Sequence, residues 1–397
     1  MHIHLFRFPF RHLKFTKEYL KLPRPIKIAF LVVFIYYLGW GLSLAYYPIY
    51  FKTVLQTYSN VGYVYAIYHF TSLCTGLILG GLLDKLNKRK VVRIILLFYF
   101  PFSFLLLNIK TLFQFIIFNI YHGVIASSLW VSMESYVRRH SPKGKSIESI
   151  ALFDLAGVFA LIFGYLISAF LITKIYFNIF YFISFFSFFA FFVAILMPDK
   201  EKTDFKIKFF RNIKHEFIDF LKNKKLRTLS IGFFLFVISI GNLSMIFPLF
   251  LKHLGTTLWS IGIIFFIMEL PYLFEGVFAV IRKRKLVVSV LTSLLILIFL
   301  SLFFIKNIGI LFLITLIIGI CFAGITPIIS GKLTETMPKI RQGELSGIIH
   351  VIRNIGYILS TFLAGQIAEL LGINFIFLFN VLFLLIFLFV IIFKVKL

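Results

Sequence analysis

The chain has 397 residues, of which 60% are hydrophobic, 19% aromatic and only 14% charged. Soluble domains carry about 25% charged residues, so this composition excludes an ordinary soluble protein. The formal net charge is +26. Nucleic-acid-binding proteins also carry a large positive charge, so the positions of the charges along the chain must decide between a membrane protein and a nucleic-acid-binding protein.

Twelve apolar segments follow one another along the chain. Each has roughly the 20 residues that a helix needs to cross a hydrocarbon core. The run from Ile175 to Met197 contains no charged residue, and neither does the run from Phe375 to Phe393. In chain order, the predicted spans are residues 26–51, 59–83, 91–107, 112–136, 150–172, 175–197, 229–251, 258–281, 286–305, 308–331, 345–371 and 375–393. The predicted fold is all-α and polytopic, with twelve transmembrane helices.

One long polar stretch, residues 198–228, divides the predicted spans six and six. We therefore expect an N-terminal segment (1–25), a six-helix bundle (26–197), a basic linker (198–228), a second six-helix bundle (229–393) and a short tail (394–397). The linker places apolar residues near helical spacing opposite Lys and Arg, a pattern typical of an amphipathic helix on a membrane surface. A solvated linker with membrane contact is favoured over a partner-binding segment.

The basic residues are distributed very unevenly around these spans. If the N-terminus is cytoplasmic, 35 of the 41 Lys and Arg residues fall at cytoplasmic ends and loops, and one lies inside a span. The five others fall in the external loops, and they are Lys52, Lys110, Lys174, Lys252 and Lys306. Such asymmetry is the positive-inside rule. It predicts a multi-pass protein of the cell membrane with both termini in the cytoplasm and an anionic inner leaflet beside it, and it removes the nucleic-acid interpretation.

The two halves of the chain carry related residues. Gly41, Pro48, Tyr50 and Lys52 recur 200 residues later as Gly241, Pro248, Phe250 and Lys252, and Gly62 recurs as Gly262. Near the eleventh span the offset is 199, since Gly144 and Gly157 match Gly343 and Gly356. Repeated halves are the sequence mark of many transporter folds. Because six spans separate the copies, the repeats are parallel about an axis along the membrane normal.

The loop between the second and third spans carries a specific motif. It reads GGLLDKLNKRKVV from Gly80 to Val92, which resembles the signature loop G-x-L-x-D-R-x-G-R-[RK]-x-x-[LIV] of the major facilitator superfamily. The matching positions include Gly80, Leu82, Asp84, Lys85, Lys88 and Arg89, whereas Asn87 replaces the second glycine. The resemblance implies a gate in which the carboxylate pairs across the two halves. In the second half, FAVIRKRKLVV has lost the glycine and the carboxylate.

Four ionisable residues inside spans are related by the same repeat. His69 corresponds to Glu269, and Asp154 corresponds to Arg353. Charged groups in a bilayer are costly and tend to mark pathways or proton relays. In the resembled fold these spans line the interface that opens and closes. We therefore treat Glu269, Asp154, Arg353, His69 and also His122 as candidates for transport or proton coupling.

Glu269 is the best single candidate, because it lies about 12 residues from either end of its span and hence near the membrane midplane. There it could hold a proton at neutral pH; the alternative is a neutral carboxyl bonded to a neighbouring helix. Arg353 cannot lose its charge. For this residue a salt bridge to an acidic neighbour is favoured over direct solute binding. A gate contact is the alternative for Asp154, and packing roles are the alternative for His69 and His122.

Polar and aromatic groups on the central spans predict the lining of a solute cavity. The candidates are Tyr36, Tyr37, Trp40, Asn119, Asn242 and Thr326. Asn119 and His122 stand where the resembled family has Arg and Gln, and Tyr165 replaces the Pro of its antiporter motif. These departures weaken a drug/proton antiporter reading. Such a lining suits a sugar-like or an amphipathic solute.

The expected function is secondary transport of a small organic solute by alternating access, with proton coupling favoured over facilitated diffusion. Glu269 followed by Pro271 resembles oligosaccharide- and phenylpropionate-type permeases. A facilitative or multidrug-type efflux permease is the alternative, and a lipid-modifying membrane enzyme or a channel is less favoured. No Walker-type nucleotide loop is present. Cys74 and Cys321 lie in spans, so the sequence implies neither a disulfide framework nor a thiolate metal site. We also expect no other metal site, no cofactor and a monomer.

Overall fold

A computed structural model describes residues 22–82, 86–142, 146–198, 223–275, 278, 284–305, 307–336 and 342–394. The N-terminal segment before residue 22, most of the linker and the last three residues lie outside this part of the chain, and so do Asp84 and Lys85. The described residues are helical apart from short connections, and no strand occurs among them.

The helices of the first half are α2 (Arg24–Ser43), η1 (Leu44–Tyr46), α3 (Tyr47–Leu55), α4 (Tyr58–Leu82), α5 (Lys88–Phe98), α6 (Phe102–Leu107), α7 (Leu112–His140), α8 (Ser146–Ile175), η2 (Tyr176–Phe180) and α9 (Tyr181–Ile195). Those of the second half are α11 (Lys224–Ile240), α12 (Leu243–His253), α13 (Leu258–Glu269), η3 (Leu270–Phe274), α15 (Arg284–Phe304), α16 (Ile308–Thr336), α17 (Gln342–Leu370) and α18 (Phe375–Phe393).

Within the described ranges, nine segments are long and apolar enough to cross a membrane. One of them, Ser149–Ile195, contains both α8 and α9. With the shorter apolar segment Leu258–Phe274 and with α17 they make twelve spans, as predicted. Four of these spans are interrupted: at η1, between α5 and α6, between α11 and α12, and at the change from α13 to η3. Pro48, Pro248 and Pro271 lie at or soon after three of these interruptions, where a missing N–H weakens the helical hydrogen-bond ladder.

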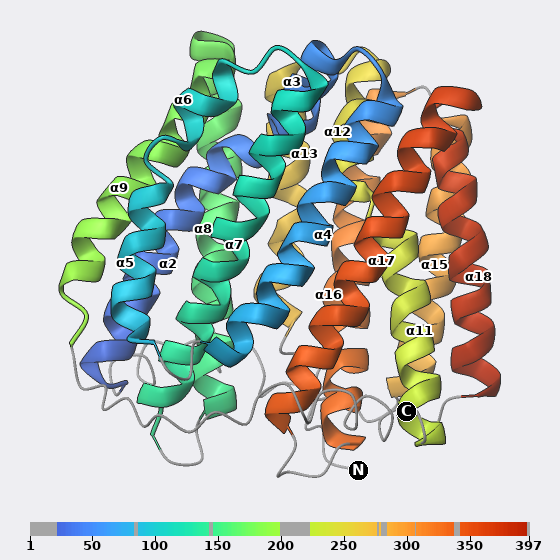
Figure 1. Ribbon diagram of the computed structural model, residues 1–397. Coiled ribbons are helices and arrows are strands. Elements are labelled where there is room, and N and C mark those ends of the chain that lie inside the picture. Colours follow the sequence, from blue (N-terminus) through green and yellow to red (C-terminus); the bar gives the residue numbers. More distant parts are fainter. Residues whose placement is uncertain are drawn as a thin grey trace, which may run out of the picture.

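The helices form two bundles that stand side by side (Figure 1). The first half, α2 to α9, makes one bundle, and α11 to α18 make the other. They meet along three pairs of helices, because α4 packs on α17, α8 on α13 and α3 on α12. Helix α2 begins and α18 ends at the same end of the molecule, which we call the terminal face. The other end, where α3 passes into α4 and α12 into α13, is the opposite face.

The repeated sequence performs the same local tasks in both bundles. Thr57 caps α4 by accepting a hydrogen bond from the N–H of Asn60 at 3.2 Å, and Thr257 caps α13 through the N–H of Ser260, also at 3.2 Å. Side-chain oxygens at this position satisfy backbone donors that a helix start leaves free. Matching caps 200 residues apart support the parallel repeat.

Close helix contacts inside a bundle depend on glycine. A Cβ on Gly41 would lie 2.8 Å from the carbonyl oxygen of Leu161 and 3.0 Å from the Cα of Gly164. Small residues let helices in a membrane approach until their backbones touch, so this pair fixes α2 against α8.

Candidate functional site

A cavity of about 590 Å³ lies between the two bundles. Its volume falls within the roughly 300–1,000 Å³ of small-molecule sites. Both bundles contribute to its wall. The first bundle contributes residues of α2, η1, α3, α4, α7 and α8, and the second contributes residues of α11, α12, α13, η3, α16 and α17. Side chains of both halves thus enclose this cavity.

Aromatic rings form much of the first bundle's wall. The indole of Trp40 stacks on the imidazole of His122, with ring centroids 4.9 Å apart and planes inclined by 6°. Tyr37 meets Trp130 edge to face at 6.0 Å. Such contacts fix the rings in place, and they give the wall flat apolar surfaces with polar edges.

Two helices present matching polar stripes to the cavity. On α4 the stripe is Tyr65, Tyr68, His69 and Ser72, and on α17 it is His350, Arg353, Asn354 and Tyr357. Both follow the spacing i, i+3, i+4, i+7, which places side chains on one helical face. The stripes belong to different bundles and touch each other, because the rings of His69 and Tyr357 lie 4.9 Å apart.

Glu269 lies on the cavity wall at the last residue of α13, where the α-helix gives way to η3. Its carboxyl group makes no hydrogen bond or salt bridge with the other residues that the structure describes. Its electrostatic neighbours are Tyr165 and Tyr272. Gly319 of α16 packs so closely beneath this point that an added Cβ would meet Met268 and Pro271.

Arg353 also lies on the wall. Its Nη2 donates to Nδ1 of His350 at 3.3 Å. No carboxylate oxygen lies within 4.0 Å of the guanidinium among the described residues, so the expected acidic neighbour is not in contact with it in this conformation. Asp154, the nearest repeat-related acid, interacts with it only at longer range.

Some polar atoms on the wall have no partner. Four of them are buried without a hydrogen bond to any described residue: Nε1 of Trp40, the hydroxyls of Tyr47 and Tyr65, and Nδ1 of His122. Buried polar groups are nearly always paired in folded proteins. Four such atoms around the same cavity therefore indicate a place that polar molecules fill.

The structure places most, but not all, of the predicted residues on this wall. Those that line it are Glu269, Arg353, His69, His122, Tyr36, Tyr37, Trp40 and Asn119. Asn242, Thr326 and Asp154 do not.

Asn242 is completely buried within the second bundle, where it donates to Oγ of Ser360 at 3.1 Å and to Oδ1 of Asn380 at 2.8 Å. It belongs to a network that joins the start of α12 to α17 and α18, and it lies in this network and not on the cavity wall. On α16 the cavity reaches Phe322, one turn before Thr326, and Thr326 itself does not line it in this conformation.

Asp154 is exposed, and its electrostatic neighbours include Glu134 and Glu275 as well as Arg353. Glu134 lies in the last two turns of α7, which ends at the terminal face. The position of Asp154 is therefore that of a residue near a mouth of the cavity, beside both bundles, rather than on its wall.

The opposite face is closed by contacts between the bundles. The backbone N–H of Tyr58 donates to Oε2 of Glu369 at 2.6 Å, and Oγ of Ser59 donates to Oε1 of Gln366 at 3.3 Å. Below them, a Cβ on Gly62 would lie 2.8 Å from the Cα of Gly365. The two backbones thus touch where α4 begins and α17 ends.

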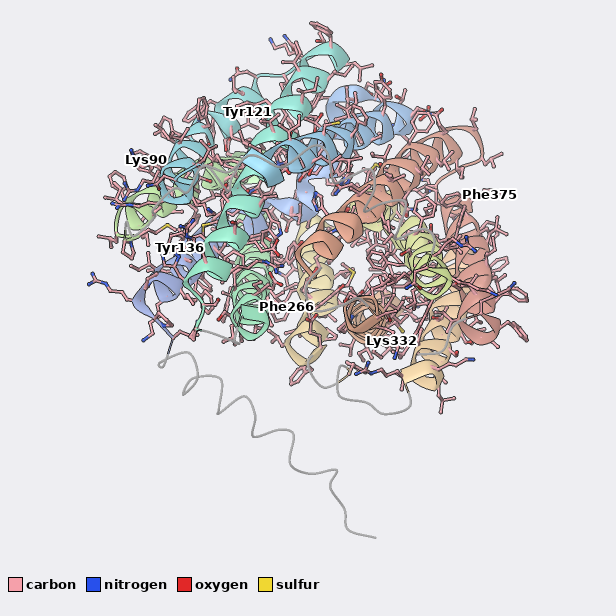
Figure 2. The ribbon with its side chains drawn as sticks, turned by 60° about the horizontal axis from the view of Figure 1, so that its bottom comes forward. Lys90, Tyr121, Tyr136, Phe266, Lys332 and Phe375 are labelled. Atoms are coloured by element: carbon pink, nitrogen blue, oxygen red, sulfur yellow. The ribbon has the colours of Figure 1, made fainter. Side chains whose placement is uncertain are left out.

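Toward the terminal face the cavity wall continues along α7 as far as Met133. Figure 2, in which this face is turned forward, shows Tyr136 of α7 and Lys332 of α16 on the two sides, with Phe266 of α13 between them in the view. The cavity therefore extends toward the terminal face and is closed at the opposite face.

Comparison with known proteins agrees with this geometry. A family model described as "Major Facilitator Superfamily" matches residues 29–359 and 273–396. The chain belongs to the major facilitator superfamily. No curated protein matches the sequence at a significant level.

Solved structures share the superfamily fold at low identity. The nucleoside transporter NupG is 15% identical with a TM-score of 0.78 and covers 94% of this chain and 100% of its own. The D-xylose–proton symporter is 15% identical with a TM-score of 0.73, covering 94% of this chain and 97% of its own. The human organic anion transporter MFSD10 is 15% identical with a TM-score of 0.67, covering 93% and 100%. At these identities the likeness concerns the fold alone.

The superfamily signature loop is described only in part. Gly80 and Leu82 fall in the last turn of α4, and Lys88 and Arg89 begin α5. Arg89 donates to the carbonyl oxygen of Ile195 at 3.3 Å. This bond holds the end of α9 within the same bundle, and the cross-bundle role of the loop remains a prediction.

Several wall residues were not among the predicted ones: Tyr47, Tyr65, Tyr68, Ser72, Trp130, Ser244 and Tyr272. Those on α4 could have been found from the sequence, because Tyr65 to Ser72 follow the same helical spacing as His350 to Tyr357. Ser244 could not have been found this way, since its orientation follows from the interruption between α11 and α12.

Proposed function

We propose that this superfamily member is a secondary transporter that moves a small organic solute by alternating access, with Glu269 carrying a coupled proton. The terminal face is cytoplasmic in this proposal, because the basic loops predict that side. The conformation with the cavity extended toward the terminal face is then the inward-facing state, and the reverse arrangement would open the opposite face.

The observation that carries the proposal is the environment of Glu269. A carboxyl group without a hydrogen bond or ion pair among the described residues, facing a cavity inside a bilayer, is costly as an anion and can be neutralised by a proton. A change in the protonation of Glu269 alters the charge of the wall when the cavity changes the side of the membrane to which it opens. The interruption of α13 at this residue, next to Pro271, supplies a point at which the span can bend.

The contacts at the opposite face support alternating access. They consist of hydrogen bonds at the helix ends and close backbone packing at Gly62 and Gly365. Side chains also meet there, since the ring of Phe170 in α8 contacts that of Trp259 in α13 and α3 packs on α12. In this proposal the bundles part at this face by a rigid rotation of one half against the other. The solute is small and polar or amphipathic, since aromatic faces and unpaired polar atoms share the wall.

Uptake into proteoliposomes tests the proposal. The full chain would be reconstituted and offered a panel of sugars, nucleosides and aromatic acids, with and without an imposed pH gradient, beside Glu269→Gln and the control Glu134→Gln. Uptake that the gradient accelerates in the wild type and in Glu134→Gln, but not in Glu269→Gln, supports proton coupling. Equal responses of wild type and Glu269→Gln would remove Glu269 from the mechanism and leave facilitated diffusion or another coupling residue.

A further inference from the structure

The cavity contains one permanent charge that the proton-coupling proposal does not use. The guanidinium of Arg353 stays protonated at any physiological pH. A cation inside a membrane protein is stabilised by a carboxylate, by backbone carbonyls or by a ligand. Its contacts in the cavity therefore indicate what it is meant to bind.

The described part of the protein supplies few hydrogen-bond acceptors to Arg353. Its one hydrogen bond among the described residues goes to Nδ1 of His350, and only a neutral imidazole has a lone pair to accept it. Asn354 lies 3.0 Å from the other ring nitrogen of His350. The guanidinium has five N–H donors, so most of them remain for another acceptor.

The acidic residues nearby do not neutralise it. Asp154 stands off the cavity wall and interacts with Arg353 only at a distance, while it is also surrounded by Glu134 and Glu275. Glu269 is on the wall but interacts with Tyr165 and Tyr272 instead. The cavity therefore has an uncompensated positive side on α17.

The remaining wall suits an apolar or aromatic body. Trp40, Tyr36, Tyr37 and Trp130 present rings to the cavity from the first bundle. Beside Arg353, the stripes of α4 and α17 add the polar groups of Tyr68, His69, Asn354 and Tyr357. A fork of N–H donors is the geometry that recognises carboxylate or phosphate, and aromatic faces recognise flat apolar groups.

We propose that the solute is an organic anion, in which a carboxylate or phosphate pairs with Arg353 and an aromatic or apolar body packs on the ring wall. This inference rests on the proposed transport function and names its substrate class. The bound anion would supply the negative charge that the protein lacks at Arg353. The cavity with anion bound would then carry less net charge than the empty cavity when it reopens to the other side of the membrane.

Tryptophan fluorescence offers a binding assay that needs no transport. Two of the three tryptophans, Trp40 and Trp130, line the cavity, and the third, Trp259, lies in the first turn of α13 at the opposite face. In a Trp259→Phe background the signal therefore reports the cavity. The purified full chain would be titrated with phenylacetate, phenyl phosphate and phenylacetamide, the last having the shape of phenylacetate without its charge.

We expect at least one anion to bind about tenfold more tightly than phenylacetamide, a difference of about 1.4 kcal/mol. Arg353→Gln should abolish this preference, Arg353→Lys should retain part of it, and Arg138→Gln, which alters a basic residue outside the cavity wall, should leave it intact. Equal binding of acid and amide, persistence of the preference in Arg353→Gln, or no binding by either anion overturns the inference. Because binding is measured without a gradient, these outcomes are independent of whether Glu269 couples protons.

Discussion

The side-chain carboxylate of Glu369 accepts a hydrogen bond of 2.6 Å from the backbone N–H of Tyr58, a residue 311 positions earlier in the chain. Tyr58 is the first residue of α4, and Glu369 lies in the last turn of α17. The contact therefore places a negative group at a helix N-terminus, where free N–H groups and the helix dipole stabilise it. It is a link between the bundles at the opposite face.

Replacing Glu369 with Gln should weaken this closure. The amide can still accept a hydrogen bond but has no charge, and interactions of this type contribute about 0.3–1 kcal/mol. We expect the opposite face to open two- to fivefold more often, because the ratio of two states depends exponentially on the free energy between them. The measurement is the rate at which a membrane-impermeant maleimide, added at the opposite face, labels Cys introduced at Ser244, an exposed cavity residue, in a Cys74→Ser/Cys321→Ser background. Glu134→Gln is the control, and an unchanged rate in Glu369→Gln would remove this link from the gate.

A methyl group at Gly62 should act on the same closure by steric means. Its Cβ would lie 2.6 Å from the carbonyl oxygen of Thr361 in the other bundle, and overpacking of this kind costs about 1–3 kcal/mol. Gly62→Ala should therefore lower the uptake rate about tenfold or more while the protein keeps its thermal stability. Gly331→Ala is the matched control, because nothing lies within 4 Å of its added Cβ. Gly41→Ala, inside one bundle, should instead lower stability; a similar loss of stability in Gly62→Ala would contradict the gate.

Asn242→Ala should destabilise the second bundle without changing solute selectivity. The substitution removes the hydrogen bonds to Ser360 and Asn380, and bonds of this kind in membrane proteins contribute about 0.6 kcal/mol on average and up to about 1.7 kcal/mol. Unfolding in a denaturing detergent, followed by far-UV circular dichroism, measures the change. A shift in which solutes bind, with stability unchanged, would return Asn242 to the cavity.

Arg93 and Lys285 should stabilise corresponding places in the two bundles. Arg93 donates to the carbonyl oxygens of Ala194 at 3.0 Å and Ile195 at 2.5 Å, and Lys285 donates to that of Ile392 at 2.6 Å. Cations at a helix C-terminus satisfy its free carbonyls and favour its dipole. Arg93→Gln and Lys285→Gln should each lower the free energy of unfolding by about 1–2 kcal/mol. Arg138→Gln, which removes a partly exposed salt bridge within α7, should change it by less than about 1 kcal/mol.

The limits of the spans were largely predictable, because apolar runs bounded by charge determine what can cross a bilayer. The predicted twelfth span, 375–393, coincides with α18. The interruptions were not located, since proline marks only the neighbourhood of a break. The direction in which a side chain points after a break depends on how the two helix pieces are rotated.

Asn242 illustrates this limit, because it lies in the short break between α11 and α12 and points into the second bundle instead of the cavity. For Glu269 and Arg353, repeat offsets and the cost of burying charge were sufficient to select residues that lie on the wall. The sequence could not specify the neighbours of Arg353 because they depend on how helices from the two bundles approach one another. His350, although on the same helical face, was not singled out as its hydrogen-bond partner.

The central claim is that two rigid bundles rock about one cavity, and pairs of spin labels test it most directly. Lys110 and Asn307 are exposed just before the starts of α7 and α16, one in each bundle. At the other ends of the bundles, Arg139 is exposed in the last turn of α7 and Lys225 in the first turn of α11. Distances within each pair would be measured by pulsed electron resonance in lipid nanodiscs over a range of pH and solute concentrations. The account predicts two populations in which one distance lengthens as the other shortens. Distances that both lengthen together, or neither of which changes under any condition that supports transport, would contradict it.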